Sequence, residues 1–394
     1  MCPFVTQPVL INRRNCVRAC AIIAEYNPFH NGHAWHIQQA REHSQADVMI
    51  AVMSGNFTQR GDLAILNKWN RAKLALSHGV DMVVELPTVE AVQSADFFAE
   101  NAVRIAHKLQ CQFISCGVES GTSQAFQEIA EALMNLPEKD FTQSYHTQVL
   151  MYLSQLFPTE MATLISTPNN QLALSYMKAI IKHDYSMQLL PIIRTSAQHY
   201  DTQVESNSCF ASGTAIRQKV LSHEDYISVV PELSYRTLQN HAVQLKTAYD
   251  KYWVILQTII MSKSLEELRC VYQMVEGIEY RLKKCVYHAE SYEHFVELVM
   301  NKRWKRARVQ RLCLYIVLNI QSQERQDSVR VLAINNVGTR YMKQLKHVDF
   351  ITQFKKNHDE KWHRQISCDK IYQTLCEQSE QNFRWIERDA NEKV

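Results

Sequence analysis

Short apolar runs alternate with amphipathic helical segments over the first half of the chain, and this alternation is the strongest constraint on its fold. The apolar runs occupy residues 17–24, 48–53, 82–86, 113–116 and 189–193, and helical patterns cover residues 67–78, 95–108, 123–135 and 171–183. Such alternation predicts an α/β fold in which helices cover both faces of a parallel sheet. Ligands of these sheets bind beyond the carboxyl ends of the strands, so motifs that follow the strands should meet at one edge.

The first apolar run leads directly into the main candidate site. Asn27-Pro28 ends the run, because a residue before proline avoids helical geometry, and a helix is expected to begin near Gly32. The amides of a first helical turn lack intrahelical partners and the helix dipole is positive there, so a phosphate chain can dock at this point. Gly32 would let the phosphate approach the backbone. His30 and His33 flank it, and each can donate a hydrogen bond to phosphoryl oxygens.

Two other interpretations of these histidines stay open at this point. A histidine at a strand-to-helix corner can cap the helix or lie on the surface without a catalytic role. His30, His33 and His36 could also bind zinc, although no cysteine or acidic ligand with suitable spacing accompanies them. The context favours phosphate binding, because the apolar strand precedes the motif, the helix follows it and the glycine lies between the two histidines.

The same residues carry a family resemblance. Residues 30–33 resemble the HxGH signature of the nucleotidyltransferase superfamily, whose members bind ATP in a Rossmann-like HUP domain and attack its α-phosphate while pyrophosphate leaves. More narrowly, the ordered segments 24–33, 53–57, 59–61 and 85–87 are similar to the bacterial tRNA(Met) cytidine acetate ligases. Weaker matches continue toward the middle of the chain, and a loose one covers residues 333–343.

The resemblance implies that the two motif histidines are catalytic and that ATP contacts several segments of the chain. Gly117 would let the adenine or ribose lie against a strand end, and Arg194 would neutralise phosphate charge after the last strand of this region. Either Asn169 or Asn170 would touch the nucleotide, while one of them caps the following helix. The implied ATP-binding residues are Ile23, Ala24, Glu25, Tyr26, Asn27, Pro28, Phe29, His30, Asn31, Gly32, His33, Ala34, Trp35, His36, Gly117, Asn169, Asn170, Arg194, Ser212, Thr214 and Arg217.

Residues 210–217 resemble the second signature of the superfamily, a turn rich in serine and threonine that opens a helix. Ser212, Thr214 and Arg217 would offer hydroxyls and a guanidinium to the β- and γ-phosphates at this second helix N-terminus. Gly213 departs from the family pattern, which has a small non-glycine residue at this position. A plain serine-capped helix is the alternative interpretation.

Residues 54–61 and 261–264 carry two further motifs. The first contains amides, hydroxyls and Arg60, and it is expected to form a mobile cover over ATP, with a solvated turn as the alternative. The second imitates the lysine loop of class I aminoacyl-tRNA synthetases. However, residues 264–267 read as an ordinary capping box before a helix, and that structure is the one we expect.

The composition changes after Pro231. No proline follows it, and Gly277 and Gly338 are the only glycines in the remainder, so this segment can sustain uninterrupted helices. A chain of 394 residues is long enough for two hydrophobic cores. We therefore expect a flexible N-terminal extension at residues 1–16, an ATP-binding catalytic domain at 17–230 and a helical C-terminal domain at 231–394.

A basic cluster in the C-terminal segment predicts contact with RNA. Its residues surround Trp304 with no acidic residue between them, and on a helix they would suit an RNA backbone, where phosphate contacts supply most of the affinity. A solvated basic face is the alternative, because residues 312–320 read as core. A turn at 335–340 followed by Lys343 and Lys346 is a second candidate contact. The predicted tRNA-binding residues are Lys302, Arg303, Lys305, Arg306, Arg308 and Arg311.

The resemblance also implies an activity. ATP would convert acetate to acetyl-adenylate, and the exocyclic amine of the wobble cytidine of elongator tRNA(Met) would then take the acetyl group. Mg²⁺ is expected as the counter-ion of ATP, and no residue cluster predicts a dedicated metal site. Two rival functions stay open. One is a small-molecule adenylyltransferase that makes a nucleotide cofactor, and the other is a nucleotide-sensing RNA-binding protein without turnover.

Bulk properties are consistent with a cytoplasmic enzyme. A formal net charge of +3 is too small to establish a nucleic-acid partner by itself. The eleven cysteines are scattered without a close-spaced framework, which favours reduced thiols over disulfides. No apolar run has the length of a membrane span, and no signal peptide is recognisable at the start of the chain.

Overall fold

One mostly parallel sheet forms the centre of the computed structural model, which describes residues 17–136, 145–194, 209–354, 359–378 and 385–386. The strand order is β5-β4-β1-β2-β3-β6-β7, and β8 also pairs with β6. Strands β1 to β5 are mutually parallel, as predicted, whereas β6 runs antiparallel to β3. The bounds are β1 Ala19–Ala24, β2 Val48–Ser54, β3 Met82–Leu86, β4 Phe113–Val118, β5 Gln188–Ile193, β6 Val329–Ile334, β7 Phe350–Ile351 and β8 Trp385–Ile386.

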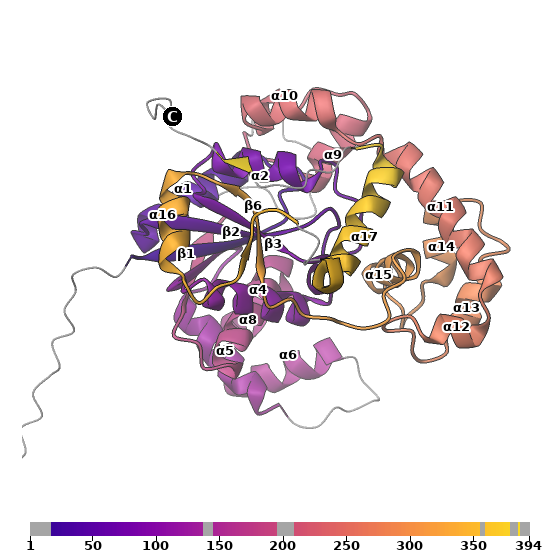
Figure 1. Ribbon diagram of the computed structural model, residues 1–394. Helices are drawn as coiled ribbons and strands as arrows, with labels where there is room; N and C mark the ends of the chain where they lie inside the picture. The colour runs from indigo at the N-terminus through magenta and orange to yellow at the C-terminus, as the bar shows by residue number, and fades with distance from the viewer. Residues whose placement is uncertain (1–16, 137–144, 195–208, 355–358, 379–384, 387–394) are drawn as a thin grey trace, which may run out of the picture.

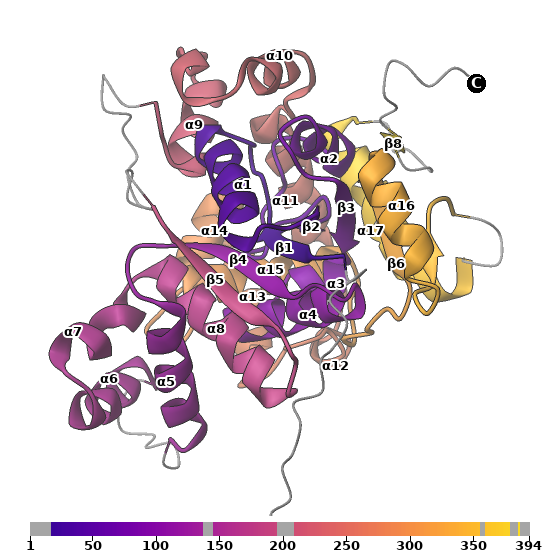
Figure 2. The same cartoon turned by 90° about the vertical axis from the view of Figure 1, so that its left-hand side faces the viewer.

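Helices cover both faces of this sheet (Figure 1). Those between the first five strands are α1 Asn31–Ser44, α2 Lys68–Leu76, α3 Thr88–Ala91, α4 Ala95–Lys108, α5 Ser123–Met134, α6 Tyr145–Leu156, α7 Thr159–Ala162 and α8 Pro168–Lys182. Figure 2 shows α5, α6 and α7 gathered at one corner of the molecule. The later helices are α9 Gly213–Leu221, α10 Glu232–His241, α11 Leu245–Ser262, α12 Leu265–Arg269, α13 Ile278–Cys285, α14 Tyr292–Val299, α15 Arg306–Val317, α16 Asn336–Gln344 and α17 Asp359–Cys376.

Side chains that alternate along the strands enter two cores, one on each face of the sheet. Cys20 and Ile22 of β1 belong to one core, while Ala19 and Ala21 belong to the other. The first core also contains apolar residues of α11 and α15, so part of the C-terminal segment packs continuously onto the sheet. The second core is closed mainly by α4, α5 and α8. The division of the chain at residue 230 stays a prediction.

The C-terminal segment is less purely helical than its composition suggested. Strand β6 lies within it and pairs Ala333 with Val83 of β3. Its sequence, VRVLAI, is rich in β-branched and aliphatic residues and is buried throughout, as a strand covered on both faces requires. A lack of proline and glycine permits long helices but does not exclude strands, and this is why the expectation missed β6.

The strand order creates a crevice beside the first strand. From β1 the chain proceeds to β2 and β3 on one side, and β4 and β5 then pair on the other side of β1. Doubly wound sheets bind their ligands at such a switch in strand order, beyond the carboxyl ends of the strands. In this chain that position lies beyond the ends of β1 and β4. None of the helices in the described parts of the chain is both long and apolar enough to cross a membrane. The predicted extension at residues 1–16 lies outside the described residues.

Candidate active site

The junction between β1 and α1 is fixed by contacts from distant parts of the chain. The side-chain oxygen of Asn27 accepts a hydrogen bond from the backbone N–H of Ile65 at 2.9 Å. The Asn31 amide donates to the carbonyl oxygens of Cys209 at 2.9 Å and Ser228 at 3.0 Å, which ties the first turn of α1 to the segments on either side of α9. Helix α1 begins at Asn31, one residue before the predicted start.

His30 and His33 stack on each other at this junction. Their ring centroids are 3.7 Å apart, and both rings line the cavity in front of α1. The backbone N–H of His30 donates to Nδ1 of His33 at 3.2 Å, in a capping box between His30 and the first turn of α1. We assign the proton of the neutral His33 ring to Nε2, because Nδ1 acts as an acceptor. The capping interpretation is therefore confirmed.

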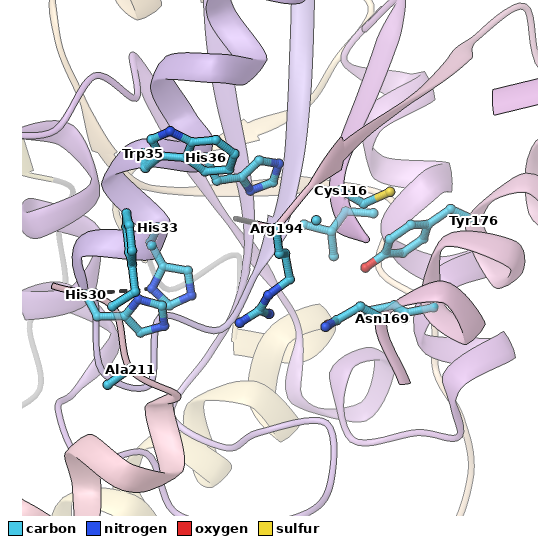
Figure 3. A pocket seen from close by; sticks show the side chains of 14 residues that line it. His30, His33, Trp35, His36, Cys116, Asn169, Tyr176, Arg194 and Ala211 are labelled. Atoms are coloured by element: carbon cyan, nitrogen blue, oxygen red, sulfur yellow. Dashed lines mark hydrogen bonds between the residues drawn. The ribbon is translucent and has the colours of Figure 1, made fainter. Parts of the chain in front are cut away.

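A first cavity of about 870 Å³, part of it open to solvent, lies beside the two histidines. Figure 3 shows Trp35 and His36 on one side of it, Tyr176 and Asn169 on the other, and Arg194 between them. A Cβ atom added to Gly117 would lie 3.5 Å from Cγ of Arg194, an ordinary contact. Protein packing thus does not demand a glycine at position 117, which is consistent with the predicted close approach of a ligand.

The side chain of His36 forms part of the wall of this cavity and is neutral. Its Nε2 lies 2.9 Å from Oγ of Ser115 on β4. Burial, assisted by the nearby Arg194 cation, lowers the pKa of His36 to about 4, so its ring carries no charge near neutral pH. Within the described part of the chain, no group of three or more His, Cys, Asp or Glu side chains is placed to hold a metal ion. The zinc interpretation of His30, His33 and His36 therefore finds no support.

The structure separates the roles of the two asparagines at the start of α8. Asn169 lines the cavity, and its amide donates to Oε1 of Glu119 at 2.6 Å. Asn170 is fully buried, and its oxygen accepts from the backbone N–H groups of Glu119 at 3.0 Å and Ser120 at 3.5 Å. The N-cap residue is Thr167, so the expectation that an asparagine caps α8 is wrong. Pro168 explains the earlier start, because proline suits the first helical position.

A second, open cavity of about 1560 Å³ continues from the first toward α9. Ser212 caps α9 by accepting from the N–H of Ala215 at 3.1 Å, as predicted. Arg217 donates to the carbonyl oxygen of Asn27 at 2.6 Å and to Oγ1 of Thr214 at 3.1 Å. A Cβ atom at Gly213 would lie only 3.0 Å from that Asn27 oxygen. This close approach explains the glycine in place of the expected small side chain.

The loop after β2 differs from the predicted mobile cover. Its first half, from Ser54 to Phe57, is buried. Arg71, itself fully buried, donates to the carbonyl oxygens of Glu25 and Ser54, which fixes the ends of β1 and β2 relative to each other. The loop reaches the second cavity only through its later residues, which are Thr58, Gln59, Arg60 and Asp62.

Not every predicted ATP-binding residue reaches a cavity. Most of them line one or both cavities, but the exceptions are Pro28, Phe29, Asn31, Ala34 and Asn170. Phe29 is fully buried beneath the histidines, and its ring lies 4.9 Å from that of Tyr26. These exceptions arise because the side chains of neighbouring residues in a turn or helix point in different directions. The prediction, in contrast, included every residue of the continuous motif.

Four cavity residues from α8 were missing from the prediction, and two of them, Pro168 and Gln171, line only the second cavity. Leu172 and Tyr176 line both cavities together with Asn169. The spacing of three and then four residues places all three on one face of the helix. That spacing is readable in the sequence once Asn169 is recognised, so it is the signal that would have found the other two.

Glu85, which was expected near the rim, is buried in an ion network away from both cavities. Its carboxylate lies 2.8 Å from Nζ of Lys68 and 3.1 Å from Nη1 of Arg330. Asp369 of α17 completes the network, at 2.5 Å from Lys68 and 3.0 Å from Arg330. All four side chains are almost completely buried. Their arrangement joins α2, β3, β6 and α17, which indicates a structural function.

The predicted tRNA-binding cluster divides into paired and unpaired cations. Arg303 and Arg308 lie 3.2 and 3.4 Å from Glu276, and Arg306 lies 2.6 Å from Glu293. Arg311 is buried, and Trp304 is buried beneath Arg308, whose guanidinium lies 3.9 Å from the ring centroid. Trp304 therefore belongs to the core beneath the cluster and not to its surface. Lys302 and Lys305 are exposed and form no ion pair among the described residues.

The chain is similar to known proteins over most of its length. A family model for HIGH Nucleotidyl Transferase matches residues 17–387. The tRNA(Met) cytidine acetate ligase of Latilactobacillus sakei subsp. sakei is 42% identical over 340 residues, which cover 84% of this chain and 85% of that protein. The protein of the same name from Anoxybacillus flavithermus is 38% identical over 348 residues, with coverages of 84% and 87%.

Two solved structures share the fold at comparable coverage. Apo Thermotoga maritima TmcAL matches with a TM-score of 0.84 and 26% identity, over 94% of this chain and 100% of that chain. The same protein bound with alpha-thio ATP matches with a TM-score of 0.83 and 25% identity, at the same coverage. The chain therefore belongs to the HIGH nucleotidyltransferase family, among the relatives of the tRNA(Met) cytidine acetate ligases.

Proposed function

We propose that this protein is an ATP-dependent tRNA(Met) cytidine acetate ligase. It activates acetate as acetyl-adenylate with release of pyrophosphate, and it then acetylates the exocyclic amine of the wobble cytidine of elongator tRNA(Met) to give N4-acetylcytidine and AMP. One observation carries the proposal: in a chain whose relatives bear that name, the His30–His33 pair opens onto a cavity at the switch point of the sheet. The ATP analogue bound by the Thermotoga neighbour supports ATP as the cavity's ligand.

The two cavities suit the two ends of ATP. The adenosine part lies in the first cavity, against Gly117 and between Trp35 and Tyr176. The triphosphate crosses the start of α1 toward Ser212 and Arg217 in the second cavity. Exposed amides at helix N-termini and a guanidinium favour negative charge along this path. Mg²⁺ would accompany ATP and would neutralise part of the charge of the triphosphate.

Catalysis of adenylation rests on positioning and charge stabilisation. Acetate attacks the α-phosphorus in line, a P–O bond to the β-phosphate breaks, and pyrophosphate leaves. The Nε2–H of His33 donates to phosphoryl oxygens as negative charge builds on them, and the stacked His30 restricts the orientation of that ring. No covalent enzyme intermediate is needed, because phosphoryl transfer gains most from orientation of the reactants. Both substrates, ATP and tRNA, are cytoplasmic, and we place the activity there.

Incubation with ATP, labelled acetate and mixed tRNA tests the function directly. The expected result is release of pyrophosphate and label in the wobble nucleotide of elongator tRNA(Met) alone. Accumulation of a stable adenylylated small molecule, with no label in tRNA, would instead indicate a small-molecule adenylyltransferase. Binding of ATP and tRNA without pyrophosphate release would indicate a nucleotide sensor, and either outcome would overturn the proposal.

The exposed lysines at the start of α15 give a separate test of the tRNA surface. Replacing Lys302 and Lys305 together by glutamine should weaken tRNA binding and reduce the slope of log K against log salt by about two, since each lost phosphate contact releases about one counterion fewer. Pyrophosphate release without tRNA should not change. The matched variant R303Q/R306Q should lose less affinity, because Glu276 and Glu293 already neutralise those cations. An unchanged salt slope in K302Q/K305Q would exclude these lysines as phosphate contacts.

A further inference from the structure

The second half of the proposed reaction needs a proton acceptor. When the cytidine amine attacks the acetyl carbonyl, a C–N bond forms, the bond between the carbonyl carbon and the phosphate oxygen breaks, and the nitrogen must lose a proton. The lone pair of this amine is delocalised into the pyrimidine ring, so it is a weak nucleophile that gains from a nearby base. His33 already has a proposed role in the first half-reaction, as a phosphate donor through Nε2, while its Nδ1 accepts from the backbone of His30.

Two carboxylates line the second cavity and are absent from the first. They are Glu25, at the end of β1, and Asp62, in the loop after β2. Oε1 of Glu25 accepts the backbone N–H of Gln59 at 2.6 Å, so this carboxylate anchors the loop beside the phosphate path. Asp62 lies beyond Gln59 along the same loop, on the side of the cavity that faces the C-terminal helices.

The loop holds Asp62 in a defined position. Thr58 and Asp62 exchange two hydrogen bonds, from the N–H of Thr58 to the Asp62 carbonyl at 2.9 Å and from the N–H of Asp62 to Oγ1 of Thr58 at 3.1 Å. Gly61 adopts a positive φ of 91°, and a Cβ atom there would lie 2.9 Å from the backbone nitrogen of Arg311. The turn is therefore packed directly against α15 and has little freedom to move.

The carboxylate of Asp62 has one occupied oxygen and one available oxygen. Oδ1 accepts from Nε2 of Gln310 at 2.8 Å and from the hydroxyl of Tyr249 at 3.5 Å. That hydroxyl in turn accepts the N–H of Leu63 at 3.1 Å, which orients its proton toward Asp62. Oδ2 has no hydrogen-bond donor among the described residues, and the side chain is partly exposed. Asp62 can therefore accept a further proton without breaking its two orienting contacts.

The position of Asp62 also fits the direction from which RNA would approach. Gln310 and Arg306 are four residues apart on α15 and so share one helix face. Arg306 begins that helix within the predicted tRNA-binding cluster, directly after Lys305. A base that leaves an RNA strand held by this cluster would therefore meet Asp62 before it reaches the acetyl-adenylate at the histidines.

We propose that Asp62 is the general base of acetyl transfer. It takes the proton from the exocyclic amine of the cytidine as that nitrogen bonds to the acetyl carbon, and AMP leaves with the electron pair of the broken C–O bond. The proposal rests on the proposed function and adds a catalytic residue to it. Burial favours this role, because it raises the pKa of the Asp62 carboxyl against the opposing effect of Arg217, Arg60 and Arg306.

The two half-reactions can be measured separately, and this makes the test selective. Hydroxylamine traps acetyl-adenylate as acetohydroxamate without tRNA, whereas single-turnover acetylation of tRNA(Met) by preformed acetyl-adenylate reports on transfer alone. D62N keeps the oxygen that accepts from Gln310 but removes the base. It should trap hydroxamate at the wild-type rate and acetylate tRNA roughly 10²- to 10⁴-fold more slowly. D62E should recover part of the transfer rate. D250N, an exposed change next to Tyr249 on α11, should behave as wild type.

The possible results separate this proposal from the function on which it rests. Wild-type transfer by D62N would overturn the assignment of Asp62, and so would a loss of hydroxamate formation equal to the loss of transfer. A selective loss of transfer in E25Q, with none in D62N, would assign the base to Glu25 instead. Wild-type protein that forms hydroxamate but labels no tRNA would overturn the proposed function, and the general base with it.

Discussion

At the scale of single residues, His33 combines a structural contact with the chemical role proposed for it. Nδ1 accepts the backbone N–H of His30, so Nε2 carries the ring proton that we propose contacts phosphate. Asparagine places a side-chain oxygen near the position of Nδ1 but has nothing at the position of Nε2. H33N should therefore keep the cap and the thermal stability, and it should still lose roughly 10²- to 10³-fold in pyrophosphate release, as expected when one preorganised donor is removed. Initial rates and thermal melts measure the two effects.

The alanine variant provides the comparison. H33A loses the cap as well, so it should be less stable than H33N by about 1 kcal/mol while its rate is equally low. tRNA binding should be unchanged in both variants. Normal pyrophosphate release by H33N would limit His33 to the cap and contradict the phosphate role.

Asn169 and Asn170 form a matched pair for separating binding from stability. N169A should raise the KM for ATP with little change in stability, because this side chain lies in the cavity. N170A should lower the free energy of unfolding by about 1–3 kcal/mol, because two backbone N–H groups lose their buried acceptor. Denaturant melts and ATP titrations of the two variants measure these effects, and a reversed pattern would contradict the assignment of Asn169 to the cavity.

The sequence was informative about the site where the site residues are contiguous. The His30–His33 junction, the serine cap of α9 and the position of Arg194 could be located because each follows a recognisable strand or opens a recognisable helix. Asp62 could not, because its place at the cavity depends on how the loop after β2 folds back onto the sheet. The sequence also could not distinguish Asn169 from Asn170, since the choice depends on Glu119, which lies about fifty residues earlier.

At the scale of elements, the first five strands were predicted within one or two residues, because buried parallel strands are short apolar runs with clear ends. The edge formed by β6 and α16 was not foreseen. Asp81 organises this edge: its carboxylate accepts from Arg41 at 2.6 Å and from the side chain of Asn335, the N-cap of α16, at 2.9 Å. Residues 336–340, predicted as a turn before a basic helix, are the beginning of α16 itself. This second candidate RNA contact is thus also a packing contact, and its basic side chains remain exposed.

Gly338 tests how closely α16 is packed on that edge. A helical glycine replaced by alanine normally gains about 1 kcal/mol of helix propensity. Here the added Cβ would collide with the carbonyl oxygen of Asp81 and lie 2.9 Å from Cγ1 of Ile334, and a backbone oxygen cannot move aside easily. G338A should therefore lower the free energy of unfolding by about 1–3 kcal/mol. K343A, on the exposed face of the same helix, is the control. A stabilised G338A would show that α16 sits farther from Asp81.

At the scale of the whole molecule, the buried ion network attaches helix α17 firmly to the central sheet. Two cations, Lys68 and Arg330, face two carboxylates, Glu85 and Asp369, and Asp369 also accepts from Asn56 of the loop after β2 at 3.1 Å. Charges removed from water are tolerated only when every one of them is paired. The network therefore couples the last described helix to the strands that position the site, although those residues lie about three hundred positions apart.

This coupling predicts cooperative unfolding of the N- and C-terminal segments. D369N leaves two buried cations with one carboxylate, so it should lower the free energy of unfolding by about 3–5 kcal/mol. E377Q, which breaks the exposed pair with Lys251, should cost at most about 1 kcal/mol.

Because Lys68, Glu85 and Asp369 belong to one network and the C-terminal helices share a core with the sheet, calorimetry should show a single transition that shifts as a whole in D369N. ATP should raise the midpoint of that same transition. Two separable transitions, with only the later segment affected by D369N, would instead support independent folding units divided near residue 230.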